Sequence, residues 1–392
     1  MQLSRPVWAE INLDNLAHNI QEVRRVTREE ALVTAVIKAD GYGHGAVAIG
    51  QTLLENGADR FAVATLSEAI QLRTVYKDID ILILGYTPNE GAKDVITHDL
   101  IQTLYSVEQA KVFANEALSQ NKALKFHVKL DTGMSRLGMQ ATDETIDAIQ
   151  QMCKLEGLEL EGIFTHFAVA DEVDKAFTLG QVKKYNWVIE KLEELGVMVP
   201  IKHVSNSASI IDMPELNFDM VRAGIMLYGL YPSKDVSHEA VKLKEVMTLK
   251  AQMSHVKTLE PGRGVSYGLK YTTETEQKIA TLPLGYADGY TRMLSGKASV
   301  MFGDQKVPVV GRICMDQCMI DVTGLDAKQG DEVTLYGGNN PEGIAIDDVA
   351  DALGTINYEV VCMVNKRVPR IYVKNGVKID AKDYVLMLKN QF

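Results

Sequence analysis

The sequence predicts an α/β protein made of an N-terminal (β/α)8 barrel and a smaller, mainly antiparallel β domain. From about residue 30 to 230, eight short apolar runs alternate with amphipathic stretches of helical periodicity. Beyond about residue 240, the apolar runs are separated by Gly, Pro, Asn and Asp turns. With 392 residues, 46% of them hydrophobic, the chain is long enough to bury two cores. We therefore expect a barrel domain over residues 1–240 and a β-rich domain over residues 241–392.

The eight apolar runs are the expected barrel strands, because strands covered on both faces read as continuous hydrophobic segments. In chain order they are LVTAVIKA (32–39), RFAVAT (60–65), DILILG (80–85), IQTLYS (101–106), KFHVKLDT (125–132), LEGIFTHF (160–167), IKHVSNS (201–207) and DMVRAGIMLYG (219–229). Helix signals lie between them. Ser106 occupies an N-cap position with Gln109 placed for a capping box, and Gly196 is placed to end the helix that contains residues 181–195.

The second domain is expected to be built from short strands joined by turns. Its apolar runs cover residues 246–256, 277–285, 306–315, 331–338 and 367–376, with one helix near IDDVADALG. No internal repeat or flexible linker marks the border between the domains. The boundary near residue 240 therefore rests on the change of pattern alone.

The balance of charge argues against a nucleic-acid partner. The chain carries 52 acidic and 41 basic residues, a net charge of −11, and has no basic stripe to neutralise a phosphate backbone. The N-terminal stretch MQLSRPVWAEINLD lacks the features of a signal peptide, and no apolar run is long enough to span a bilayer. We expect a cytoplasmic protein without a membrane partner.

The cysteines predict neither a disulfide framework nor a metal site. They are few and scattered, and the single C-x-x-x-C pair has no histidine cluster beside it. We expect no bound metal, and buried free thiols at Cys153, Cys314, Cys318 and Cys362.

Functional groups of a (β/α)8 barrel gather at the carboxyl ends of its strands. In this sequence those ends carry many polar side chains: Lys38, Lys129, Asp131, Arg136, His166, Asn206, Ser207 and Arg222. A lysine at a strand end is usually a solvated charge, but in a desolvated barrel mouth its pKa can fall from about 10.4 toward roughly 7 to 8. Lys38 could then form an imine and accept a proton.

A phosphate site is better supported than a dinucleotide site. The loop GYGHG after Lys38 has its third glycine one residue too early for a dinucleotide loop, and the expected acidic residue is missing. Ser207 is expected to begin a helix whose free N–H groups face the rim, and Gly224 allows the backbone to come close. Ser207 could also be a simple N-cap. A lysine opposite a phosphate site is what pyridoxal 5′-phosphate requires.

Eight motifs, in order along both domains, give the sequence a resemblance to bacterial alanine racemase, a fold-type III pyridoxal-phosphate enzyme. They are AVIKADGYGHGA (35–46), HVKLDTGMSRLG (127–138), THFAVAD (165–171), SNSAS (205–209), MVRAGIMLYGLYP (220–232), VSYGLKY (265–271), GRICMDQ (311–317) and INYEV (356–360). The resemblance implies a racemase that binds pyridoxal 5′-phosphate, interconverts L- and D-alanine, and supplies D-alanine for peptidoglycan.

The resemblance also implies roles for individual residues. Lys38 would bind the cofactor and act as the base on one face of the substrate, with Tyr267 on the other, because inversion requires proton removal and delivery on opposite sides. Arg222 would donate to the pyridine nitrogen and, being always charged, would leave the ring a weaker electron sink. His166 would bridge Arg222 and Tyr267, although alone it resembles a satisfied core histidine.

Further residues would hold the cofactor and the substrate. The phosphate would contact Tyr42, Ser207, Gly224, Ile225 and Tyr358. Arg136 and the backbone N–H of Met315 would bind the substrate carboxylate, and Lys129 matches a lysine that is carbamylated in some family members and then orients Arg136. Five residues would narrow the entrance, or else form ordinary surface ion pairs: Tyr286, Arg292, Arg312, Asp316 and Asp171.

The resemblance implies a head-to-tail homodimer in which the partner's second domain completes each barrel mouth, so that a monomer would be inactive. Three alternatives remain: a racemase of broader or different specificity, for serine or lysine; a non-catalytic pyridoxal-phosphate-binding protein; and a fold-type III decarboxylase. Tyr358 favours alanine over serine, and the VSYG and CMDQ motifs argue against the binding protein. Arg222 argues against the decarboxylase, which carries a carboxylate at that position.

Overall fold

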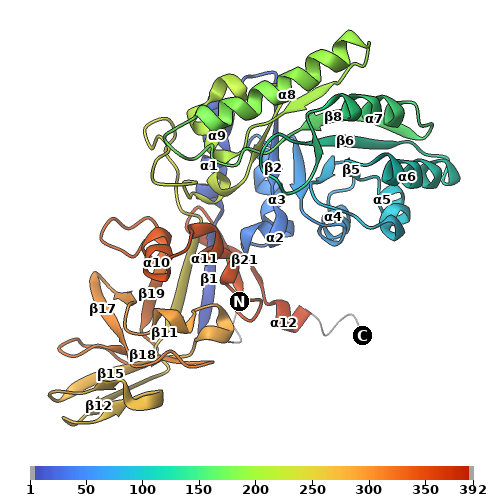
Figure 1. The fold of residues 1–392 in the computed structure, drawn as a ribbon. Helices are drawn as coiled ribbons and strands as arrows, with labels where there is room; N and C mark the ends of the chain where they lie inside the picture. Colours follow the sequence, from blue (N-terminus) through green and yellow to red (C-terminus); the bar gives the residue numbers. More distant parts are fainter. Residues whose placement is uncertain (1–4, 388–392) are drawn as a thin grey trace. The chain divides into compact units, whose positions relative to one another are not determined.

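The computed structural model describes residues 5–387 and consists of two compact units. One unit contains residues 17–41 and 46–243, and the other contains Tyr42–Gly45, the residues before Ala17 and those from Lys244 onward (Figure 1). The chain therefore begins in the second unit and returns to it twice, first at Tyr42 and again at Lys244.

The first unit is a parallel eight-stranded barrel, which confirms the predicted fold class. Its sheet has the order β10-β2-β3-β4-β5-β6-β8-β9, and the gap between β9 and β10 is bridged by N–H donation from Arg222 to the Ser205 carbonyl at 3.1 Å. All eight predicted strands are present: β2 (Leu32–Val36), β3 (Arg60–Val63), β4 (Ile81–Ile83), β5 (Ile101–Leu104), β6 (Leu124–Asp131), β8 (Leu158–Phe164), β9 (Ile201–His203) and β10 (Met220–Ala223).

The strand register places the candidate residues at one end of the barrel. Thr34 of β2 lies opposite Arg222 of β10, and both strands are parallel. Lys38 follows β2 and Gly224 follows β10, so these two residues lie at the carboxyl ends of neighbouring strands.

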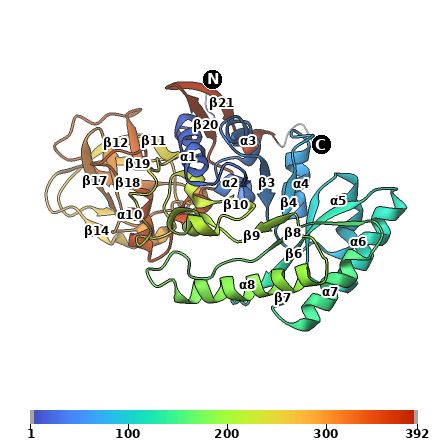
Figure 2. The ribbon, with the colours of Figure 1, turned by 90° about the horizontal axis from the view of Figure 1, so that it is seen from above.

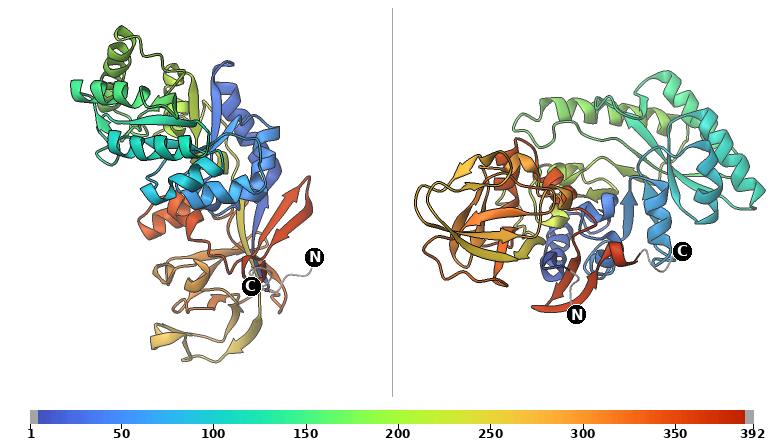
Figure 3. Two further views of the ribbon diagram at one scale, coloured as in Figure 1. Left: turned by 90° about the vertical axis from the view of Figure 1, so that its right-hand side faces the viewer. Right: turned by 90° about the horizontal axis from the view of Figure 1, so that it is seen from below.

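Helices lie on the outside of the barrel strands (Figure 2 and Figure 3). They are α1 (Leu13–Val26), α3 (Ala46–Glu55), α4 (Leu66–Arg73), α5 (Ala92–Thr97), α6 (Val107–Ser119), α7 (Asp143–Cys153), α8 (Ala176–Glu194) and α9 (Ser207–Asp212). Gly196 follows α8 with φ 72°, in the left-handed conformation expected just beyond a helix end.

The predicted capping box of α6 is only half formed. The Ser106 hydroxyl accepts a hydrogen bond from the Gln109 N–H, as expected for an N-cap. The Gln109 side chain instead donates to the Thr87 carbonyl at 2.8 Å. In a capping box the Gln109 amide oxygen would accept from the Ser106 N–H. The Gln109 side chain pairs with a buried carbonyl instead, because leaving that carbonyl unpaired would cost more than the lost cap bond.

The second unit is built on a mostly antiparallel ten-stranded sheet of order β12-β15-β18-β17-β16-β19-β11-β1-β20-β21. In chain order its strands are β1 (Val7–Asn12), β11 (Met247–Gln252), β12 (His255–Leu259), β15 (Gln277–Leu282), β16 (Ser299–Phe302), β17 (Gln305–Val310), β18 (Cys318–Asp321), β19 (Glu332–Gly337), β20 (Arg370–Lys374) and β21 (Val377–Lys382). A hairpin of β13 (Gly264–Val265) and β14 (Tyr271–Thr272) and the helices α10 (Ile346–Leu353), α11 (Asn357–Met363) and α12 (Tyr384–Met387) complete this unit.

The first strand of the chain belongs to this second sheet, whereas the sequence pattern predicts residues 1–240 as the barrel domain. Strand β1 pairs antiparallel with β11 and parallel with β20. The Trp8 side chain packs against Ile371 and Val373 of β20. The sequence of β1 signals a strand but contains no information about which distant strand pairs with it.

The four cysteines are free thiols of different exposure. Cys318 is buried and Cys153 and Cys314 are partly buried, but Cys362 is exposed, so the expectation of buried thiols is wrong for Cys362. Among the described residues, no helix combines the length and the apolar character that crossing a membrane requires.

Candidate active site

Lys38 begins a short turn, α2 (Lys38–Tyr42), whose backbone is left-handed. The φ angles are 51° at Ala39, 53° at Asp40 and 50° at Tyr42. Each non-glycine residue in this conformation costs roughly 1 to 2 kcal/mol, so the turn persists only where its surroundings hold it. Such stored strain is typical of functional sites and directly follows the lysine singled out from the sequence.

Two carboxylates hold this turn in place. The Asp40 carboxylate accepts a hydrogen bond from the Ala46 N–H at 2.9 Å. One oxygen of Glu68 accepts from the Ala39 N–H at 2.7 Å, while its other oxygen accepts from the Ala64 N–H at 2.8 Å. Strand β3 and helix α4 thereby fix the backbone next to Lys38.

Four cationic groups lower the pKa of His166, which follows β8. Burial and the positive charges of Arg222, Lys129, Arg136 and Lys38, in decreasing order, hold the pKa of His166 well below its usual value. His166 is therefore neutral at pH 7. A concentration of positive charge around one neutral imidazole is suited to binding an anionic ligand.

Arg222 is the most deeply fixed of these cations, with an exposed fraction of 4%. One terminal nitrogen donates to the carbonyls of Thr165 at 2.9 Å and Val204 at 3.0 Å and lies 3.4 Å from His166 Nδ1. The other donates to His203 Nδ1 at 3.0 Å. Among the described residues, no atom accepts a hydrogen bond from Arg222 Nε, which leaves this donor for a ligand.

Lys129 is a buried amine on β6. Burial, followed by the charges of Arg222 and Arg136, lowers its pKa to about 7, with Asp131 acting in the opposite direction. Its Nζ donates to the Leu130 carbonyl at 3.0 Å. At neutral pH about half of this amine is therefore unprotonated, which is the form that reacts with an electrophile such as CO2.

The predicted phosphate residues form a separate group after β9 and β10. The buried Ser207 hydroxyl accepts hydrogen bonds from the N–H groups of Gly224 at 3.0 Å and Met226 at 3.5 Å. Asn206, not Ser207, caps helix α9, because its side chain accepts from the Ser209 N–H. The alternative that Ser207 is a simple N-cap is therefore wrong. Ile225 is buried directly after Gly224.

In the second unit, Tyr42 and Tyr358 lie together, with ring centroids 6.2 Å apart. Burial, followed by the nearby Cys362, raises the pKa of the Tyr42 phenol. The loop after Tyr42 is held by Arg370, which is buried and donates through Nε to the Gly43 carbonyl at 2.9 Å. The loop that carries Tyr42 is thus fixed by a buried hydrogen bond.

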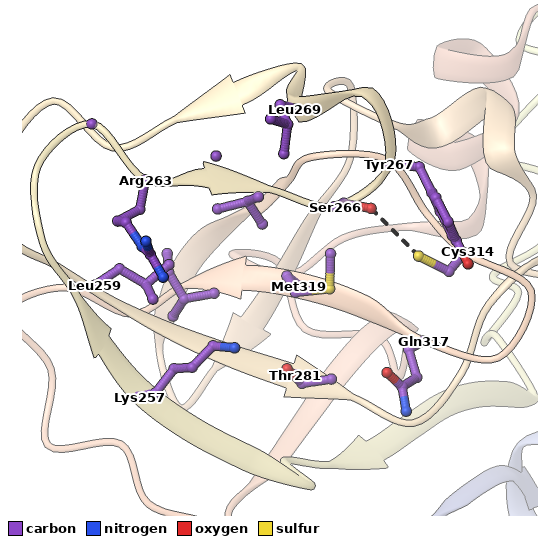
Figure 4. A pocket seen from close by; sticks show the side chains of 14 residues that line it. Lys257, Leu259, Arg263, Ser266, Tyr267, Leu269, Thr281, Cys314, Gln317 and Met319 are labelled. Carbon is purple, nitrogen blue, oxygen red and sulfur yellow. Dashed lines mark hydrogen bonds between the residues drawn. The ribbon is translucent and has the colours of Figure 1, made fainter.

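Tyr267 lies at the tip of the β13–β14 hairpin, next to a pocket of about 680 Å³ (Figure 4). Its side chain is 71% exposed, and that of Met315 is 52% exposed. The preceding residue, Ser266, has φ 65° and donates its hydroxyl to the Arg312 carbonyl at 2.6 Å. The backbone at the hairpin is therefore fixed, although Tyr267 itself is largely exposed.

The five predicted entrance residues differ in their contacts and in their exposure. Asp316 forms an ion pair with Arg367 at 2.7 Å, as the surface alternative predicted. The Tyr286 N–H donates to the Cys314 carbonyl, and the Asp171 carbonyl accepts from Ser233. Arg292 is exposed and Arg312 is partly buried. Four of them belong to the second unit and Asp171 belongs to the barrel unit.

Sequence reasoning missed a set of buried polar residues inside the barrel. His203, His127 and Glu161 lie on β9, β6 and β8, and His203 contacts Arg222. A histidine within the apolar run KFHVKLDT and a glutamate just before GIFTHF were the available signals. Within residues 5–387, no group of three His, Cys, Asp or Glu side chains is arranged to hold a metal ion.

Comparisons with known proteins match nearly the whole chain, across both units. The family model "Alanine racemase, N-terminal domain" matches residues 11–232, and "Alanine racemase, C-terminal domain" matches residues 246–372. The protein named alanine racemase 1 from Clostridium acetobutylicum is 48% identical over 382 residues, covering 97% of this chain and 99% of the relative. An alanine racemase from Methanococcus maripaludis is also 48% identical, covering 95% of this chain and all of that relative.

Solved structures give the same result. The alanine racemase of Clostridium difficile superposes with a TM-score of 0.95 at 46% identity, covering 98% of this chain and 100% of that one. The alanine racemase of Bacillus anthracis with bound L-Ala-P superposes with a TM-score of 0.93 at 34% identity, covering 99% and 100%. The barrel with its cationic rim, the second sheet and the two matching family domains together show that the chain belongs to the alanine racemase family.

Proposed function

We propose that this protein interconverts L- and D-alanine with pyridoxal 5′-phosphate as its cofactor. The observation that carries the proposal is the buried Arg222 guanidinium at the barrel rim, which lies 3.4 Å from the neutral His166, a ring whose pKa the charges of Arg136 and Lys38 also lower. A phosphorylated cofactor and an amino-acid carboxylate both supply the negative charge that such a site needs. The relative from Bacillus anthracis, solved with bound L-Ala-P, is consistent with this choice.

The residues present fit this cofactor. The Lys38 amine would bind its carbonyl carbon, and Arg222 Nε, which has no acceptor among the described residues, would donate to its ring nitrogen. The phosphate would be held next to Gly224 by the Ile225 N–H, by the phenols of Tyr42 and Tyr358, and by the Ser207 hydroxyl, which accepts from the Gly224 N–H and can donate its own proton. When bound, the cofactor supplies an electron-withdrawing ring that takes up the charge left when the substrate Cα loses its proton.

Two side chains would move the proton. Lys38 Nζ would remove or deliver it on one face of the substrate Cα, and the Tyr267 hydroxyl would do so on the other. Because the two bases hold their protons on opposite faces, neither has to travel around the substrate. The exposure of Tyr267, at 71%, suits a residue that works against a second copy of the chain, so we infer a homodimer with shared sites.

The substrate carboxylate would be bound by Arg136 and the Met315 N–H. Lys129 would support Arg136 as a carbamate, since its pKa of about 7 makes the amine available to CO2 and the product is an anion. Carbamylation would replace the repulsion between the Lys129 and Arg136 cations with an attraction. Tyr286, Arg292, Arg312, Asp316 and Asp171 would restrict the entrance to small amino acids.

Borohydride trapping of the cofactor-loaded protein tests the proposal. Peptide mass analysis should place the pyridoxyl label on Lys38, and turnover should be faster on alanine than on serine or lysine. A label on another lysine would reject the assigned site. Faster turnover on serine or lysine would establish the alternative of different specificity, and CO2 release would indicate a decarboxylase.

A further inference from the structure

A chain of buried polar side chains leads from Arg222 through the barrel. Arg222 contacts His203 Nδ1 at 3.0 Å, and His203 Nε2 lies 2.8 Å from His127 Nδ1. His127 Nε2 lies 2.8 Å from the Glu161 carboxylate. We call these four residues the buried polar chain. None of them is more than 8% exposed, and His203, His127 and Glu161 have no part in the proposed proton transfer or in binding the substrate.

The buried polar chain spans the depth of the barrel. Arg222 is near the carboxyl end of β10, where the candidate site lies. At the other end, Arg60 is the first residue of β3 and donates to Glu161 at 2.8 Å and to Asp80 at 2.7 Å. The candidate site is thereby connected to the amino ends of the strands by an unbroken series of short contacts.

The two ends of the chain determine the direction of every hydrogen bond. A guanidinium can only donate, so His203 Nδ1 accepts and the proton of His203 is on Nε2. That N–H donates to His127 Nδ1, which places the His127 proton on Nε2, where it donates to the Glu161 carboxylate. Both histidines are therefore neutral and carry their protons on Nε2.

The charges agree with this assignment. Burial and then the charge of Arg222 hold the pKa of His203 well below its usual value, and burial lowers that of His127 despite the pull of Glu161. Burial alone would raise the pKa of Glu161, but the hydrogen bond from His127 and the charge of Arg60 lower it to about 2. The buried polar chain thus has a cation, Arg222, at one end and an anion, Glu161, at the other.

The surrounding packing leaves room for these rings and little else. A Cβ at Gly162 would lie 2.6 Å from two atoms of the His127 ring, so only glycine fits beside it. The Phe164 ring stacks on His203 at 4.7 Å with an interplanar angle of 12°. The orientation of both imidazoles is therefore fixed by steric contact as well as by hydrogen bonds.

We propose that His203, His127 and Glu161 are positioning residues that hold the Arg222 guanidinium toward the cofactor ring and moderate its positive charge through the distant carboxylate. The inference rests on the proposed function, because it takes Arg222 as the partner of the ring nitrogen. Outer hydrogen-bond partners of this kind orient a functional group and tune its electronics. The alternative is that the buried polar chain only stabilises the barrel and has no effect on catalysis.

The first test needs no variant. In the cofactor-loaded wild-type protein labelled with ¹⁵N-histidine, NMR should show His203 and His127 as neutral rings protonated on Nε2 at pH 7. An imidazolium or an Nδ1–H form of either ring would overturn the proposal. Borohydride labelling of the same sample tests the proposed function separately, because the ring tautomers do not depend on whether Lys38 is labelled.

The second test removes the distant charge. Glu161→Gln keeps an acceptor for His127 but loses the anion, and we expect kcat to fall about tenfold with KM within about twofold, the size of effect known for outer partners at metal sites. The His203 ¹⁵N signals and the absorption maximum of the bound cofactor should shift as well. Glu159→Gln, an exposed change on the same strand, is the matched control and should alter none of these.

A third variant keeps the proposal testable if Glu161→Gln fails to fold. Gly162→Ala would displace the His127 ring without removing any charge, and should shift the His203 ¹⁵N signals and lower kcat in the same direction. Unchanged His203 signals and kcat in whichever of the two variants folds would leave only the stabilising role and overturn the proposal.

Discussion

The two halves of the candidate site differ in how far a single chain completes them. On the barrel rim, Arg222 and Lys129 are at most 6% exposed, and buried contacts hold them. On the β13–β14 hairpin, Tyr267 and Met315 are 71% and 52% exposed. Preorganised groups in a water-excluded site act strongly on a ligand, whereas an exposed phenol does not. Under the proposed function, the hairpin half would act against a second copy of the chain.

The largest effect is expected on the barrel side of this comparison. Lys38→Ala removes both the attachment of the cofactor and one base, so kcat for alanine racemisation should fall by at least about 10⁴-fold. Lys93→Ala, at an exposed position on helix α5, is the control and should keep wild-type activity. If kcat of Lys38→Ala stays within about a hundredfold of the wild-type value, another group must bind the cofactor and act as the base.

Tyr267→Phe tests the hairpin side. Losing one acid–base group should slow racemisation by about 10³-fold, within the usual range for general acid–base catalysis. The equilibrium constant of a racemisation is one, so kcat/KM must fall equally in both directions. The asymmetry appears in the exchange of the α-hydrogen with D2O. One enantiomer should still exchange its α-hydrogen, and the other should no longer do so. Equal exchange rates for both enantiomers would remove Tyr267 from its role.

The buried charge of Lys129 should destabilise the barrel in a pH-dependent way. Its pKa is about 7 in the folded state and about 10.4 when unfolded, so below pH 7 both states are protonated and the cost of burial is fully present. In CO2-free buffer, Lys129→Met should be more stable than wild type at pH 6 by about 2 to 4 kcal/mol. Urea unfolding should show this advantage shrinking between pH 7 and 10; an advantage independent of pH would contradict the argument.

The smallest effect is expected at the entrance. Asp316 pairs with a partly exposed arginine, so Asp316→Asn should change the free energy of unfolding by less than about 0.5 kcal/mol. If Asp316 also narrows the entrance, KM for alanine should rise about threefold. Asp326→Asn, which breaks another exposed ion pair of the same unit, should leave KM unchanged. An unchanged KM in both variants would assign Asp316 to the surface alone.

Local patterns were sufficient to predict much of the fold. The barrel strands are continuous apolar runs because both faces are buried, and the helix end at Gly196 needs a residue that tolerates a φ of 72°. These features depend on neighbours in the sequence. The pairing of β1 with β11 and β20 does not, since a strand sequence does not specify a distant partner.

The site shows the same limit. Lys38 and Arg222 could be recognised because they lie at the ends of predicted strands. The left-handed turn at Ala39–Tyr42 has only one glycine to signal it and depends on Glu68, which lies on another element. His127 and Glu161 are 34 residues apart, and their contact arises only when β6 and β8 become neighbours.

A mixed dimer tests the central claim most directly, which is that Lys38 and Tyr267 of different subunits serve one site. Lys38→Ala and Tyr267→Phe chains, co-expressed with different tags and purified through both, form a dimer with one intact and one doubly altered site. We predict about half of the wild-type activity from this dimer, while each parent homodimer remains nearly inactive. A mixed dimer as inactive as its parents would show that both bases come from the same chain, which contradicts the account.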